Sequence, residues 1–127
     1  MATEFTVALE DRPGTLADLS EALAKNAVNI TAIHATPCPG EWCVQFITNN
    51  ADATMLALKD GGFDYTAQEV LLVTLANEPG TLARLSRALG NAGININSLY
   101  IAMSGQIVLD VTDLRKAQQI AMSAGAM

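Results

Sequence analysis

The sequence contains one segment twice. Pro13–Leu23 and Pro79–Leu89 lie 66 residues apart and are identical at nine of eleven positions. A fixed internal period is typical of a duplicated folding unit, so it limits the possible folds before any single residue is considered. We therefore expect two similar modules, residues 1–68 and 69–127, each close to the lower size at which a domain is stable alone. The boundary between two such modules is a common place for a small ligand.

The composition indicates a globular protein that works in water. Half of the residues are apolar, 16% are charged, and no apolar run approaches the ~20 residues that cross a bilayer. Met1–Glu4 places no basic segment before an apolar one, so we expect no secretory signal and a cytoplasmic location. The net charge is −6 and the seven basic residues are scattered along the sequence. We therefore expect neither nucleic acid nor an anionic membrane as a partner.

Metal and disulfide chemistry have little support. Cys38 and Cys43 flank a predicted hairpin loop and could face each other, but in a reducing cytoplasm two free thiols are the expectation. The chain has one histidine and no second pair of metal ligands, so we expect no metal site and no cofactor.

Both repeats show the same order of secondary-structure signals. Residues 4–9 and 71–75 alternate as strands with one buried face do, and leucines then recur at helical spacing after a polar loop. Runs rich in β-branched residues predict two further strands joined by a hairpin, and a second helix follows. In the first repeat these elements are predicted at 28–33, 42–48 and 51–60, and in the second at 94–99, 106–112 and 113–123.

The predicted order is strand, helix, strand, strand, helix, strand in the first repeat. Phe63–Ala67 supplies its fourth strand, whereas the second repeat reaches Met127 without room for one. This is the split βαβ arrangement, so we predict an α+β fold of two ferredoxin-like βαββαβ repeats, the second lacking its last strand. The missing strand would leave the edge of Val70–Leu75 unpaired. Because an exposed apolar edge invites pairing, we expect at least a homodimer.

Each repeat joins its first strand to its first helix through an Asx-x-Pro-Gly loop. The loops are Asp11–Gly14 and Asn77–Gly80. Proline fixes φ near the start of a helix, and glycine lets another group approach the backbone. The helix N-terminus then presents free N–H groups and the positive end of its dipole, which suit a carboxylate.

These residues resemble the ACT domain, a small-molecule-sensing module attached to many enzymes of amino-acid metabolism and also found in free tandem proteins. The resemblance covers nearly all of both repeats. It rests on Asp11-x-Pro13-Gly14-x-Leu16 with Val28-Asn29-Ile30, and on Asn77-x-Pro79-Gly80-x-Leu82 with Gly93-Ile94-Asn95-Ile96.

The resemblance implies two clefts that bind amino acids, because paired domains of the family often place the strand–helix loop of one against the second strand of the other. The first cleft would have a carboxylate at Asp11 where the second has the neutral Asn77, so we expect the first to hold an α-ammonium group better. The asparagine amides could read either end of a zwitterion. The first site comprises Asp11, Gly14, Thr15 and Leu16 with Asn95 and Ile96, and the second Asn77, Gly80, Thr81 and Leu82 with Asn29 and Ile30.

Simpler interpretations exist for the same residues. Asp11 and Asn77 could satisfy backbone N–H groups at the helix start. The glycines of the two loops could ease tight packing, and the two strand asparagines could be solvated amides.

Three classes of function follow. The leading one is a non-catalytic sensor that binds an amino acid between the repeats and regulates a partner enzyme or transporter. The second is a dimerisation or scaffold module with empty clefts. The third is an enzyme, for which His34 and Cys38 are weak candidates without a matching base or carboxylate pair.

Overall fold

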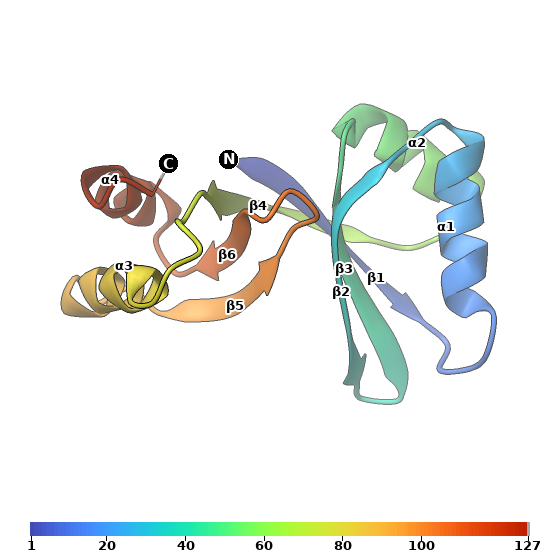
Figure 1. Ribbon diagram of the computed structural model, residues 1–127. Coiled ribbons are helices and arrows are strands. Elements are labelled where there is room, and N and C mark those ends of the chain that lie inside the picture. The colour runs from blue at the N-terminus through green and yellow to red at the C-terminus, as the bar shows by residue number, and fades with distance from the viewer. Residues whose placement is uncertain (127) are drawn as a thin grey trace. The chain divides into compact units, whose positions relative to one another are not determined.

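The computed structural model describes residues 1–126. The chain divides into two compact units, one of Thr3–Gln68 and one that runs from Glu69 onward and takes in Met1 and Ala2. Each unit has strands on one side and two helices on the other (Figure 1). Among the described residues, no helix is long and apolar enough to cross a membrane.

The first unit is an antiparallel sheet covered by two helices. Its strands lie in the order β2-β3-β1, followed by the first residues of β4, and Phe5 of β1 is paired with Phe46 of β3. Both helices lie on the same face of this sheet (Figure 1). The elements are β1 (Ala2–Leu9), α1 (Thr15–Lys25), β2 (Ile30–Cys38), β3 (Glu41–Thr48), α2 (Ala51–Asp60) and the start of β4 (Thr66–Val73).

The core of the first unit lies between that sheet face and the helices. Phe5 and Phe46 are fully buried, and their ring centroids are 5.8 Å apart. Leu19 and Leu23 of α1 and Leu58 of α2 pack on them. The leucine spacing and the strand alternation in the sequence therefore mark the buried faces correctly.

The second unit repeats this arrangement with one strand fewer. Its strands lie in the order β4-β6-β5, and Leu109 of β6 is paired with both Leu71 and Leu99. Its core contains Leu85 and Leu89. The predicted α+β fold of two ferredoxin-like repeats, the second without its last strand, is confirmed for the described residues. The further elements are α3 (Thr81–Asn91), β5 (Ile96–Ile101), β6 (Ile107–Val111) and α4 (Leu114–Ser123).

Two details of the prediction change. The fourth strand of the first repeat leads directly into the first strand of the second as the single strand β4, but it begins at Thr66, so Phe63–Tyr65 of the strand predicted at Phe63–Ala67 lie outside it. The prediction of an unpaired strand edge at Val70–Leu75 is wrong at Thr74, because the Thr74 N–H donates to the carbonyl of Ala126 at 2.7 Å. Ala126 is itself buried in the core of the second unit. The residues after α4 thus take over one hydrogen bond of the missing strand.

The expectation of two free thiols is also wrong, because Cys38 and Cys43 form a disulfide. The β2–β3 hairpin pairs Thr36 with Cys43 and Cys38 with Glu41. This register brings the two cysteine Cα atoms to 5.8 Å, inside the range that a disulfide requires. The prediction of free thiols rests on the reducing cytoplasm alone and does not take this hairpin geometry into account.

The disulfide closes a short loop, so its removal should have a modest cost. We expect Cys38→Ser with Cys43→Ser to lower the free energy of unfolding by about 2 kcal/mol, from the loop-closure entropy of a bridge with a sequence separation of 5. Trp42 is the only tryptophan and lies inside the loop, so its fluorescence during urea unfolding reports the change. Dithiothreitol should lower the wild-type midpoint and leave that of the double variant unchanged. Equal midpoints for oxidised and reduced wild type would contradict the prediction.

Candidate functional site

The loop after β1 is held by short-range hydrogen bonds. The N–H of Arg12 donates to the Glu10 carbonyl at 2.9 Å, and the Thr15 hydroxyl donates to the Arg12 carbonyl at 3.2 Å. Thr15 is 6% exposed and is the first residue of α1. The loop geometry therefore fixes where α1 begins.

The loop after β4 has the same design. The N–H of Glu78 donates to the Ala76 carbonyl at 2.9 Å, and the Thr81 hydroxyl donates to the Ala76 and Glu78 carbonyls at 2.7 and 3.1 Å. Thr81 is the first residue of α3. Both helices of the duplicated segment thus start in the same way.

Both helices have a glycine as N-cap. Gly14 and Gly80 have φ of 92°, the left-handed region, which L side chains rarely adopt. No side chain caps either helix, so the simpler interpretation of Asp11 and Asn77 as helix caps is not supported. The first N–H groups of α1 and α3 have no side-chain acceptor, and the N–H of Thr81 donates to the Glu78 carbonyl at 3.4 Å.

The space beside the two glycines differs. A Cβ at Gly14 would meet no heavy atom within 4 Å, so this glycine serves the backbone conformation and not tight packing. A Cβ at Gly80 would lie 3.3 Å from Nη1 of Arg84. The α1 loop is therefore the more open of the two.

The α1 loop also carries its own ion pair. Nε of Arg12 lies 2.7 Å from Oε2 of Glu10, and both side chains are exposed. The hydrogen bond to Glu10, and then the charge of Glu10, raise the pKa of Arg12 above its ordinary value. The neighbouring Asp11 is exposed. The second loop has Ala76, Asn77 and Glu78 in the corresponding positions, so no such pair exists there.

The two strand asparagines lie just before β2 and β5. The N–H of Asn29 donates to Oδ1 of Asn49 at 2.9 Å, and the N–H of Asn95 donates to the Thr112 hydroxyl at 3.0 Å. The Asn95 amide also donates to Oδ1 of Asn97 at 3.2 Å. Both asparagines are exposed, whereas Ile30 and Ile96, which follow them, pack partly against the cores.

Within one unit, the loop and the asparagine lie at opposite ends of the strands. Leu9, just before the loop, is paired with Trp42, which is paired with Pro37 near the hairpin. Ile30, just after Asn29, is paired with Thr48 at the other end of β3. A site that combines such a loop with such an asparagine therefore needs two repeats or two chains, and the twelve predicted ligand-binding residues stay a prediction. Leu16 packs partly on the first core, and Leu82 is 43% exposed.

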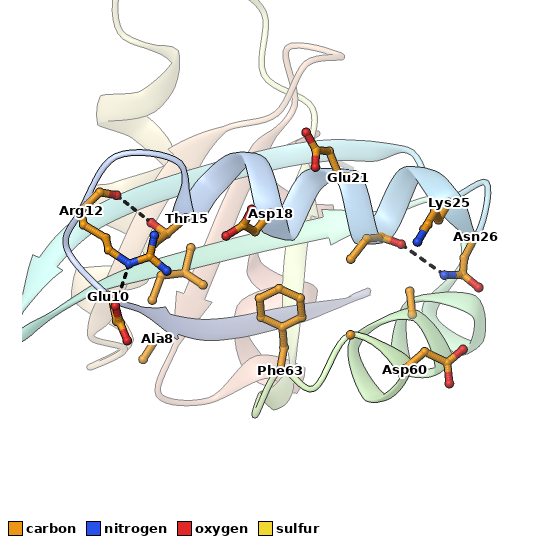
Figure 2. A pocket seen from close by; sticks show the side chains of 14 residues that line it. Ala8, Glu10, Arg12, Thr15, Asp18, Glu21, Lys25, Asn26, Asp60 and Phe63 are labelled. Carbon is orange, nitrogen blue, oxygen red and sulfur yellow. Dashed lines mark hydrogen bonds and ion pairs between the residues drawn. The ribbon is translucent and has the colours of Figure 1, made fainter.

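The first unit contains a groove that the sequence did not predict. It has a volume of about 680 Å³ and lies between α1 and α2 beside the end of β1 (Figure 2). Its floor is apolar and its rim is charged, and Thr15 is the one predicted site residue that lines it. The second unit has a smaller hollow of about 130 Å³ at the corresponding place, lined in part by Thr81 and Arg84.

The comparisons with known proteins agree with this fold. Residues 70–121 match the family model of the ACT domain. Among curated protein sequences, none matches the chain.

Solved structures share the fold at low sequence identity. A protein from Bacteroides thetaiotaomicron has a TM-score of 0.90 and 24% identity, over 98% of this chain and 89% of that one. The regulatory subunit of aspartate kinase from Thermus thermophilus, in a ligand-free form, has a TM-score of 0.71 and 20% identity, over 98% and 89%. The corresponding subunit from Thermus flavus has a TM-score of 0.63 and 18% identity, over 98% and 92%. The second repeat thus matches the ACT domain, and the whole chain has the fold of these regulatory subunits.

The loop conformation predicts the effect of a substitution at Gly14. Gly14→Ala should lower the free energy of unfolding by about 1 kcal/mol, because an L residue is strained in the left-handed region while its Cβ meets open space. Gly14→Asn should cost less, since asparagine tolerates this conformation. Gly90→Ala, inside α3, is the matched control and should stabilise the protein. Thermal and urea unfolding measure all three, and a neutral Gly14→Ala would argue against the left-handed turn.

Proposed function

We propose that this protein is a non-catalytic regulator that binds an amino acid where two of its repeats meet and changes its contacts with a partner enzyme or transporter of amino-acid metabolism. The observation that carries the proposal is the pair of glycine-capped loops, each of which leaves the first N–H groups of a helix without a side-chain acceptor. The match of residues 70–121 to the ACT domain supports it. So do the Thermus structures, which are regulatory subunits of aspartate kinase.

The chemistry of a zwitterion fits the first loop. Its carboxylate would accept hydrogen bonds from the N-terminal N–H groups of α1 and would be favoured by the helix dipole. Its ammonium group would donate to the Asp11 carboxylate, and Asn95 of a second repeat would supply an amide at the remaining edge. Such a ligand shifts an equilibrium between arrangements of the repeats only by its difference in affinity for them.

A second copy of the chain has a suitable place to bind. β5 is the last strand in the order β4-β6-β5, so one side of its backbone has no neighbouring strand in the second unit. Apolar side chains accompany this edge, with Leu99 exposed by 37% and Ile101 by 65%. Edge strands of this kind favour pairing with another chain, so we propose a homodimer in which the clefts are shared.

The scaffold hypothesis remains the alternative. It expects side chains to fill the space beside the loop glycines, so that no ligand has room. The open space beside Gly14 favours a ligand in the first cleft, whereas Arg84 occupies part of the space beside Gly80. The two clefts are therefore expected to differ in affinity.

Ligand-dependent thermal stabilisation across the twenty amino acids tests the function. At least one amino acid should raise the unfolding temperature, by the mass-action effect of binding to the folded state alone. Asp11→Asn should weaken binding roughly tenfold, because a charge-assisted hydrogen bond to the ammonium group is replaced by a neutral one. Asn77→Asp, the matched variant of the second loop, should leave the tighter site unchanged. No stabilisation by any amino acid would favour the scaffold, and equal affinities at the two clefts by calorimetry would contradict the role of Asp11.

A further inference from the structure

The helices of the second unit carry cations and no carboxylates. α3 contains Arg84 and Arg87, α4 contains Arg115 and Lys116, and neither helix contains an aspartate or a glutamate. All four cations are exposed. They are four of the seven basic residues of the chain, so basic residues that are scattered in the sequence come together on one helical layer.

The helices of the first unit have the opposite balance. α1 and α2 contain four carboxylates against two cations, and all six side chains are exposed. The carboxylates are Asp18, Glu21, Asp52 and Asp60, and the cations are Lys25 and Lys59.

The duplicated segment shows where this difference arises. Its two copies differ at two of eleven positions, where Asp18 corresponds to Arg84 and Glu21 corresponds to Arg87. Both differences reverse the charge, and both lie three residues apart on the exposed face of the same helix. Everything else in the segment is identical, including the leucines that face the core.

The acidic pair of α1 borders a groove between two helices, whereas the hollow beside the arginine pair is lined by α3 alone. Asp18 and Glu21 line the groove between α1 and α2, in which Figure 2 shows the Phe63 ring below α1. Arg84 and Arg87 line a hollow on α3, which Ala88 and Asn91 share with a neighbouring hollow against α4.

Asp18, Glu21, Arg84 and Arg87 form no ion pair among residues 1–126. In the first unit Arg12 pairs with Glu10, and the charge of Asp18 also helps to raise the pKa of Arg12. Lys116 lines the hollow against α4 and donates a hydrogen bond to the Ala92 carbonyl at 3.2 Å. The helices of the two units therefore carry net charges of opposite sign.

We propose that the α1–α2 face of one molecule docks on the α3–α4 face of a second molecule of the same chain. The chain itself supplies both faces, and the charges that would meet stand at equivalent positions of nearly identical helices, so their spacing along the helix axis is matched. Two acidic faces repel each other, and so do two basic faces, so the first repeat of one molecule should pair with the second repeat of the other. This contact joins different surfaces of two copies, so it can close a dimer or extend into larger assemblies. It does not depend on the proposed ligand or on pairing through β5.

Exposed ion pairs are individually weak, so the association should be weak and sensitive to salt. The Debye length falls from about 10 Å at 0.1 M salt to about 3 Å at 1 M, which screens charges between separate molecules. We therefore expect the sedimentation coefficient at a fixed protein concentration to fall as salt is raised. Assemblies held by apolar strand pairing respond to salt in the opposite way or not at all.

Charge exchange between the two faces tests the proposal. Asp18→Arg with Glu21→Arg makes the exposed faces of α1 and α3 both basic, and Arg84→Asp with Arg87→Glu makes them both acidic. Each double variant should associate with itself roughly tenfold or more weakly than wild type at low salt, because two attractions become repulsions. A mixture of the two double variants should associate, and the quadruple variant, with the charges exchanged, should recover wild-type behaviour.

A matched control separates the local charges from net charge. Glu41→Arg with Asp64→Arg changes the net charge as much as Asp18→Arg with Glu21→Arg, at exposed positions outside the helices, and should leave salt-sensitive association in place. Circular dichroism and thermal unfolding verify that each variant is folded. Three results would overturn the proposal: wild type without salt-sensitive association, a quadruple variant that fails to recover it, or loss on exchange at the arginines alone. The last result would assign the basic face to a different anionic partner.

Discussion

One-sided burial is the constraint on which both repeats depend. Each sheet packs its helices on one face only, so each helix presents a leucine stripe inward and leaves its other face to solvent. Leu19 and Leu23 correspond to Leu85 and Leu89, and all four are 0–1% exposed. The inward face cannot change without opening a cavity in the core. The outward face is free to diverge, and both differences in the duplicated segment, Asp18/Arg84 and Glu21/Arg87, lie there.

The same constraint governs the loops that lead into those helices. For Leu19 or Leu85 to reach the core, the helix must begin a fixed number of residues after its strand and turn back over the sheet. A glycine with φ of 92° makes this turn in both repeats. Because the cap is a glycine, no side chain covers the first N–H groups of the helix. The geometry that the fold requires thus also leaves a place where a carboxylate can bind.

The sequence predicted the features that arise from local periodicity and left out those that arise from pairing in space. Strand alternation around Phe5 and leucine spacing in the helices are visible in one dimension, and the α+β fold followed from them. The Cys38–Cys43 bridge depends on hairpin register, and the hydrogen bond from Thr74 to Ala126 depends on where the chain lies after α4. The α1–α2 groove is formed by two helices that are distant in the sequence, so no sequence motif predicts it. The predicted clefts need two repeats together, and no pattern within one repeat specifies how repeats meet.

The first repeat brings the two proposed activities onto one helix. The N-terminus of α1 offers the backbone groups for a carboxylate, and Asp18 stands on its first turn, with Glu21 on the next turn. An anionic ligand group at the helix start and a cationic surface over Asp18 would be linked through this rigid element, since each alters the electrostatic potential that the other meets. In the second repeat Arg84 takes the position of Asp18 and lies close to Gly80, so a cation already lies beside the N-terminus of α3. Coupled binding is reciprocal, so a ligand in the first cleft should strengthen the docking of a basic helix face, and that docking should strengthen binding of the ligand. The second cleft should be coupled in the same way to an acidic partner.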